Sequence, residues 1–286
     1  DMQGITAKIE DTLGMLVDWG FLVGEKTADD FVSADALGGP EELKATPLGM
    51  RVSQLYLDPL TAHQLITGLM RLEQASFFAY VHLVCASQEM RPLLRIKTAD
   101  YEELEHVLAE EELLRKEPSI YDPDYETFLA AVKTAKLLAD WCQEVGEEEL
   151  LEAYGVRPGE LRYRLERADW LLYAASELAR LLKRHQHIAP MAKARKRLKY
   201  GVKEQLLALL TFKNIGRVRS RTLYRNGVRT AKDVKRIDAS TLSELLGPAL
   251  AKDLKKQVGQ DIDDVQLSPQ KRKGQLSLQA KRFQDS

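Results

Sequence analysis

The residues with the clearest chemistry form an arginine-rich segment, NIGRVRSRTLYRNGV, at positions 214–228. Its four arginines have no acidic neighbour within the segment, and Gly216 is a residue at which the backbone can turn before a helix begins. The first N–H groups of a helix lack intrahelical partners and therefore attract anions. The segment predicts phosphate contacts by the Gly216 backbone and by Arg217, Arg219 and Arg221.

The charge of the chain is distributed unevenly, although its 286 residues have a formal net charge of only −1. Residues 193–236 carry fifteen Lys or Arg against two acids, a net charge of +13. Such a block is typical of a nucleic-acid contact, whereas a solvated helix face usually carries both signs. If residues 214–228 lacked this positive charge, the simplest interpretation would be an ordinary helical hairpin.

The basic run at Arg195, Lys196 and Arg197 predicts a further DNA contact, a linker, or both.

A long helical segment, PGELRYRLERADWLLYAASELARLLKRH at 158–185, offers a different chemistry. Its apolar stripe predicts a core-facing side. Tyr163, Arg167 and Trp170 recur at i, i+4 and i+7 on another face, with Arg162 beside them. Aromatic rings of this kind stack on the bases of a single strand, at about 1–3 kcal/mol per base. Packing of Trp170 on a neighbouring helix is an equally supported interpretation.

Catalytic and metal sites are not indicated by the sequence. It contains no G-x-x-x-x-G-K-[ST] phosphate loop, no H-E-x-x-H and no G-x-S-x-G. Cys85 and Cys142 are the only cysteines, so neither a disulfide framework nor a cysteine-based zinc site is expected. We therefore predict no catalytic residue, metal or cofactor in this chain. The sequence also has no apolar run of membrane length and no secretory leader, which predicts a soluble intracellular protein.

The pattern of apolar residues predicts a mainly α fold. Residues 1–58 look like the later part of a winged-helix domain, with a helix, a short strand and an extended entry to Pro47. Residues 59–190 form a helical domain, and 191–262 a small domain resembling a helix-hairpin-helix. Residues 263–286 have no core pattern and predict a flexible tail. The helices are expected near 60–73, 76–87, 101–115, 125–141, 158–185, 203–212, 217–226, 230–236, 240–246 and 248–257.

Three segments together resemble a known family: TPLGMRVSQLYLDPLT, PGELRYRLERADWLLYA and RLKYGVKEQLLALLTFKNIGRVRSRTLYRNGV. Their order is similar to the C-terminal half of archaeal Ski2-like superfamily 2 DNA helicases of the Hjm type, related to the polymerase theta helicase. The resemblance implies a winged helix, a helical ratchet domain and a helix-loop-helix domain after an ATPase motor. It implies that Trp170 stacks on the translocating strand. Where many members have an arginine seven residues earlier, this chain has Tyr163, and the usual Arg-Ala-Arg is Arg219-Ser220-Arg221.

The function implied by this resemblance is that of the DNA-binding C-terminal region of an ATP-dependent 3′–5′ DNA helicase. The implied substrates are forked or lagging-strand DNA at stalled replication forks, and the implied location is the archaeal cytoplasm, at the nucleoid. ATP and Mg²⁺ belong to the motor, whose motifs this chain lacks, so the chain alone is expected to be inactive. The alternatives are the same region of a Ski2-like RNA helicase and a free-standing nucleic-acid-binding scaffold.

The tail predicts a partner-binding peptide, because 271–283 combines bases with apolar residues outside any core. Gln275, Leu278 and Phe283 partly fit a sliding-clamp peptide, although Phe283 comes late and alone. The single-strand-binding protein is an equally good candidate partner. A disordered solubilising tail is the third interpretation.

Overall fold

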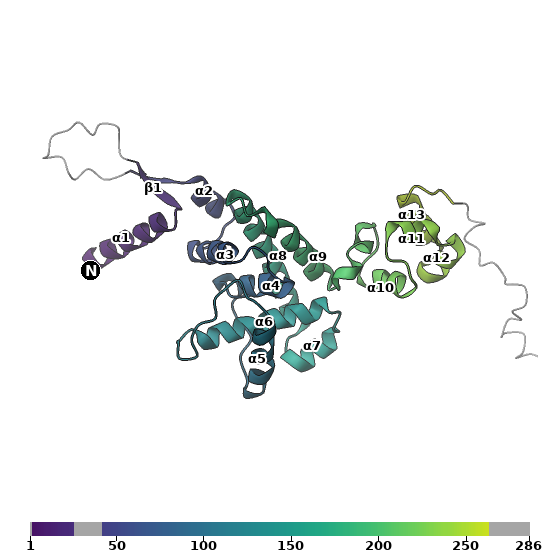
Figure 1. The fold of residues 1–286 in the computed structure, drawn as a ribbon, viewed down its shortest axis with the longest axis horizontal. Coiled ribbons are helices and arrows are strands. Elements are labelled where there is room, and N and C mark those ends of the chain that lie inside the picture. The colour runs from purple at the N-terminus through teal and green to yellow at the C-terminus, as the bar shows by residue number, and fades with distance from the viewer. Residues whose placement is uncertain (1, 26–41, 263–286) are drawn as a thin grey trace, which may run out of the picture. The chain divides into compact units, whose positions relative to one another are not determined.

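The computed structural model describes residues 2–25 and 42–262, and Figure 1 shows them as a mainly helical protein. The predicted fold class is confirmed, since the strands that the described residues form are one short antiparallel pair. The chain divides into two compact units between Gly201 and Val202. Each unit has its own apolar core. The predicted tail, 263–286, lies outside the described residues.

The first unit begins with a helix and a β-hairpin. Helix α1 (Met2–Asp18) is followed by strands β1 (Leu22–Glu25) and β2 (Glu42–Ala45), which pair antiparallel with Leu22 opposite Ala45. Helix α2 (Pro47–Gln54) then starts at Thr46, whose hydroxyl accepts a hydrogen bond from the Gly49 N–H at 3.0 Å. This is a typical N-cap. The assignment of residues 1–58 to a partial winged helix stays a prediction.

Five further helices form the body of the first unit. Asp58 and Ser76 cap the starts of α3 and α4, because their side-chain oxygens accept hydrogen bonds from first-turn N–H groups. The central helix α4 is buried along almost its whole length and packs on α6. The elements are α3 (Pro59–Arg71), α4 (Phe77–Cys85), α5 (Tyr101–Glu110), α6 (Tyr125–Cys142) and α7 (Glu147–Tyr154).

Helices α8 (Pro158–Leu181) and α9 (Ile188–Tyr200) complete the first unit and run side by side (Figure 1). Almost every residue of the expected apolar stripe of α8 is buried: Leu161, Ala168, Leu172, Ala175 and Ala179. The predicted domain boundary at 190/191 differs from the structure. Because Met191, Ala194 and Leu198 are buried in the first core, α9 belongs to the first unit and the division falls after Gly201.

The second unit packs four short helices around a small core. They are α10 (Arg217–Arg225), α11 (Ala231–Arg236), α12 (Ala239–Leu246) and α13 (Pro248–Gln257). The helix expected at 203–212 is instead two 3₁₀ turns, Glu204–Leu206 and Leu209–Thr211. Lys255 is buried, and its ammonium donates to the carbonyls of Lys235 and Ile237 at 3.0 and 2.6 Å. Burial lowers the pKa of Lys255.

The end of α9 depends on a close approach between Gly201 and Trp141. Gly201 ends the helix with φ +60°, and a Cβ atom there would lie 2.4 Å from Cε2 of the Trp141 ring. The indole N–H of Trp141 in turn donates to the Leu198 carbonyl at 2.9 Å. Glycine is therefore required at this position both by the backbone conformation and by the ring.

We predict that Gly201→Ala destabilises the first unit more than Gly155→Ala does. Gly155 also ends a helix with positive φ, at +69°, but nothing lies within 4 Å of its Cβ position. Both variants incur the left-handed strain of about 1–2 kcal/mol, and Gly201→Ala adds overpacking of about 1–3 kcal/mol. Urea unfolding of both variants measures the difference. Equal losses of unfolding free energy in the two variants would show that the Trp141 ring does not exclude a side chain at position 201.

Candidate nucleic-acid interface

The aromatic row on α8 consists of Tyr163, Arg167 and Trp170, and the structure brings these three side chains together. The Arg167 guanidinium carbon lies 5.1 Å from the centre of the Tyr163 ring and 5.8 Å from the centre of the Trp170 ring. Both distances are within the range of a cation–π contact. Tyr163 is 39% exposed and the other two are half-buried. The row is therefore an aromatic surface with a cation between its two rings.

Trp170 has a structural contact as well as an exposed part. Its indole N–H donates to the Leu55 carbonyl, just after the end of α2, at 3.3 Å. The ring also packs against the core of the first unit. The structure thus shows the packing that the sequence offered as one interpretation, since one edge of the ring is fixed by the fold. The side chain keeps partial exposure, and base stacking stays a prediction.

Arg162 lies beside this row but is paired. Its Nε donates to the Glu166 carboxylate at 2.9 Å, one turn further along α8, and both side chains are exposed. An exposed pair of this kind contributes little to stability, because water and salt screen it. Arg162 thus stays accessible to a phosphate group, which would compete with Glu166.

The basic run of α9 differs from the prediction, because two of its three members serve the fold. Arg197 is 7% exposed, and its guanidinium carbon lies 3.7 Å from the centre of the Phe77 ring. Arg197 therefore packs its charge against an aromatic face, and its contact with DNA stays a prediction. Arg195 is half-buried and forms a two-point ion pair with Asp169, at 2.8 and 3.0 Å. Lys196 is the exposed member.

The arginine-rich hairpin lies in the second unit, where the residues before α10 form a braced loop. Gly216 is the N-cap and offers no capping side chain, so the first-turn amides of α10 point beyond the helix. The guanidinium of Arg219 donates to the Asn214 carbonyl at 2.7 Å. Arg219 is exposed, Arg217 and Arg221 are half-buried, and no Cβ contact would form at Gly216. Of the predicted phosphate-binding residues, Gly216, Arg217 and Arg219 therefore lie at the start of α10, and Arg221 lies one turn further along it.

Two residues that stabilise this loop were not found by sequence reasoning. Gln257 on α13 clamps the backbone of Lys213, since it accepts from the N–H at 2.8 Å and donates to the carbonyl at 3.3 Å. Asn214 adopts φ +63°, a conformation that asparagine tolerates better than most residues. An asparagine two residues before a glycine, as in Asn214-Ile215-Gly216, is a pattern from which the positive φ of Asn214 could have been predicted. The role of Gln257 depends on a contact between residues far apart in the sequence.

The described residues contain no group of three or more His, Cys, Asp or Glu side chains that could hold a metal ion. Cys85 and Cys142 are both buried. Among the helices of the described ranges, none is long and apolar enough to cross a membrane. The predicted tail residues Gln275, Leu278 and Phe283 lie outside the described residues.

Comparisons with known proteins assign this fold to a class. Residues 78–201, from α4 to the end of α9, match the family described as archaeal helicase, domain 4. The chain is 39% identical over 223 residues to the ATP-dependent DNA helicase Hel308 of Methanocaldococcus jannaschii, covering 78% of this chain and 18% of that protein. For Hel308 of Thermococcus kodakarensis the identity is 35% over 238 residues, covering 81% and 21%.

The mainly helical chain with an aromatic row on α8 is thus a helical region of the archaeal Ski2-like helicases. It belongs to the Hel308 family. Hel308 of Pyrococcus horikoshii, at 32% identity over 243 residues, agrees with this assignment. The chain spans about a fifth to a third of the length of these three relatives.

We predict that Arg197→Ala lowers the stability of the fold and that Lys196→Ala does not, although the two residues are adjacent. Arg197→Ala removes a buried guanidinium from Phe77 and should cost about 2–4 kcal/mol of stability, as core truncations do. Lys196→Ala should leave the unfolding free energy within about 0.5 kcal/mol. Thermal unfolding beside a DNA titration separates the two. An unchanged melting temperature for Arg197→Ala would contradict its structural role.

Proposed function

We propose that this chain is the DNA-binding C-terminal region of an ATP-dependent 3′–5′ DNA helicase that acts on forked or lagging-strand DNA at stalled replication forks. The observation that carries the proposal is the position of Arg167 between the rings of Tyr163 and Trp170. Such a surface suits single-stranded nucleic acid, because bases stack on the rings while the cation attracts phosphates. The names of the relatives, ATP-dependent DNA helicases, support the reaction.

The proposed roles of the parts follow from their chemistry. The row on α8 holds the bases of the translocating strand, and the hairpin at Gly216 holds phosphates through amides and arginines. ATP and Mg²⁺ would be bound by a motor outside this chain, so this chain alone binds DNA without hydrolysing ATP. The winged-helix and ratchet assignments, and a location at the nucleoid in the cytoplasm, belong to the same proposal.

Three further proposals rest on the sequence. Gln275, Leu278 and Phe283 are proposed to bind either the single-strand-binding protein or the sliding clamp. A Ski2-like RNA helicase is the alternative function, because an aromatic row stacks on RNA bases equally well. A free-standing scaffold is the third candidate, favoured only by the separation of acidic and basic segments along the chain.

We predict that the chain binds single-stranded and forked DNA with strong salt dependence and little sequence preference. Phosphate contacts release counterions, so the logarithm of the affinity falls linearly with the logarithm of the salt concentration, with a slope of about −0.7 per contact on a single strand. Fluorescence titrations at four salt concentrations, with matched single-stranded DNA, forked DNA and RNA, measure this. Affinity independent of salt would reject phosphate binding, and tighter binding of RNA would favour the alternative.

Trp170→Ala is predicted to weaken single-strand binding by about 1–3 kcal/mol, since a stacking ring is lost. Trp170→Phe is the matched control, because it keeps a ring but removes the N–H that donates to the Leu55 carbonyl. If the ring stacks on a base, Phe retains most of the affinity that Ala loses. If both variants lose stability equally while their DNA affinity is unchanged, Trp170 is only a packing residue.

A further inference from the structure

An irregular segment of the first unit, residues 91–97, lies beside the aromatic row and has no assigned role. It connects the 3₁₀ turns Gln88–Met90 and Thr98–Asp100. It carries three cations, Arg91, Arg95 and Lys97, and all three side chains are exposed. An exposed irregular segment is expected to move unless other elements fix it. Here it is fixed from two sides.

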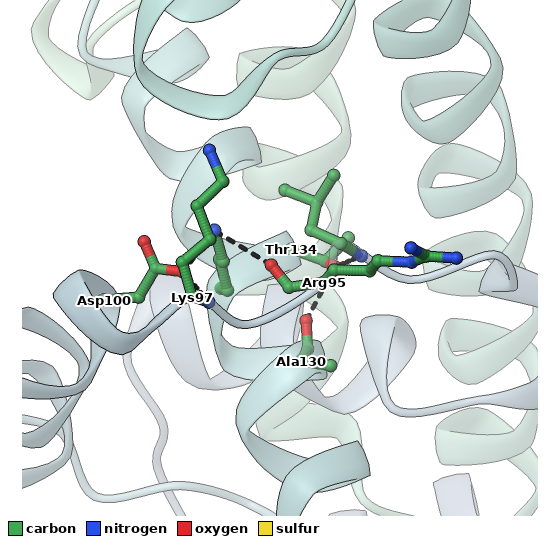
Figure 2. Close-up of polar contacts among 7 residues, drawn as sticks. Arg95, Lys97, Asp100, Ala130 and Thr134 are labelled. Carbon is green, nitrogen blue, oxygen red and sulfur yellow. Dashed lines mark hydrogen bonds and ion pairs between the residues drawn. The ribbon is translucent and has the colours of Figure 1, made fainter.

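Helix α6 fixes the middle of segment 91–97. The Leu94 N–H donates to the Thr134 hydroxyl at 3.1 Å, and that hydroxyl donates to the Ala130 carbonyl at 2.7 Å (Figure 2). The buried Lys133 ammonium donates to the Arg95 carbonyl at 3.0 Å and to Asp100 at 2.5 Å. Although burial opposes it, the Lys133 ammonium and the Lys97 amide keep the pKa of Asp100 below its usual value.

Helix α8 fixes the start of the segment. The Arg164 guanidinium is buried and donates to the Pro92 carbonyl at 3.1 Å. The adjacent Tyr163 hydroxyl lies 3.5 Å from the Arg91 carbonyl. Since Tyr163 is the first ring of the row, Arg91 lies at the end of the row that is farther from Trp170. Segment 91–97 therefore continues the exposed surface of α8.

All of these contacts use the backbone of the segment and leave its arginine side chains available. In the part of the chain that the structure describes, neither the Arg91 nor the Arg95 guanidinium has an ion-pair partner. Figure 2 shows the Arg95 guanidinium pointing away from Asp100. Both arginines line an open cleft of about 570 Å³ between the segment and the start of α6. Glu126 supplies the negative charge among the lining residues, against these two cations.

We propose that segment 91–97 is a second nucleic-acid contact, in which Arg91 and Arg95 bind the phosphates of the strand whose bases stack on Tyr163 and Trp170. Two buried cations, Lys133 and Arg164, are positioning residues that hold the backbone of the segment. The backbone of the segment is thereby held in place, while the charges of Arg91 and Arg95 stay available to a ligand. This inference rests on the proposed function, since it requires that α8 binds a single strand.

The test is a salt titration of single-stranded DNA binding with the double variant Arg91→Gln/Arg95→Gln. The loss of two phosphate contacts should lower the magnitude of the salt slope by about 1.4, which is roughly a 25-fold loss of affinity at about 0.1 M salt. The melting temperature should not change, because neither side chain has a partner that the fold needs. Arg91→Lys/Arg95→Lys keeps both charges and should keep the slope.

A matched control removes the same charge elsewhere. Lys8→Gln/Lys116→Gln replaces two exposed lysines that line neither the cleft nor the row on α8. Equal effects of the control and the arginine variant would overturn the inference, since general charge would then explain the loss. If the unchanged chain binds no single strand, both the proposed function and this inference fail. If it binds and responds to Trp170→Ala while the arginine variant matches the control, only the inference fails.

Discussion

The burial of α8 on small side chains is the constraint on which the first unit depends. Ala168, Ala174, Ala175 and Ala179 are fully buried, so the helices that pack on α8, among them α9 and α4, can approach its backbone closely. Because so much of its circumference is occupied, α8 has only a narrow exposed face for binding. The aromatic row lies on this face. The packing that makes α8 the centre of the unit therefore also determines where its rings can meet a ligand.

Buried cations are the second physical feature of this protein. Lys133, Arg164, Arg197 and Lys255 are all buried, and each contacts backbone carbonyls, a carboxylate or an aromatic face. Such groups are stable inside a protein only when they are paired or hydrogen-bonded. The number of Lys and Arg residues in the sequence therefore overstates the number of cations that DNA could contact. Within the basic block at 193–236, Arg197 serves the core and Arg195 pairs with Asp169, whereas Arg219 and Lys196 are exposed.

Local patterns in the sequence predicted the helices well, and long-range contacts account for what was missed. The stripe of α8 and the i, i+4, i+7 row could be predicted because helical periodicity places residues on faces. Helix α9 was not among the expected helices, and its basic run was interpreted as a DNA contact, a linker, or both, although Met191, Ala194 and Leu198 have helical spacing. The roles of Arg197, Gln257 and segment 91–97 could not be predicted, because each depends on a residue more than forty positions away or on another element.

The two units present cations at their surfaces in different ways. In the hairpin, Arg219 and the first-turn amides of α10 offer contacts to phosphates, which salt screens and which carry no preference for a base. On α8, one guanidinium lies between two rings, so stacking and charge act at the same place. Salt screens the attraction between charges and acts less on the stacking of a base on an uncharged ring. Salt should therefore weaken nucleic-acid binding at the hairpin more than binding on α8, where the rings contribute independently of charge.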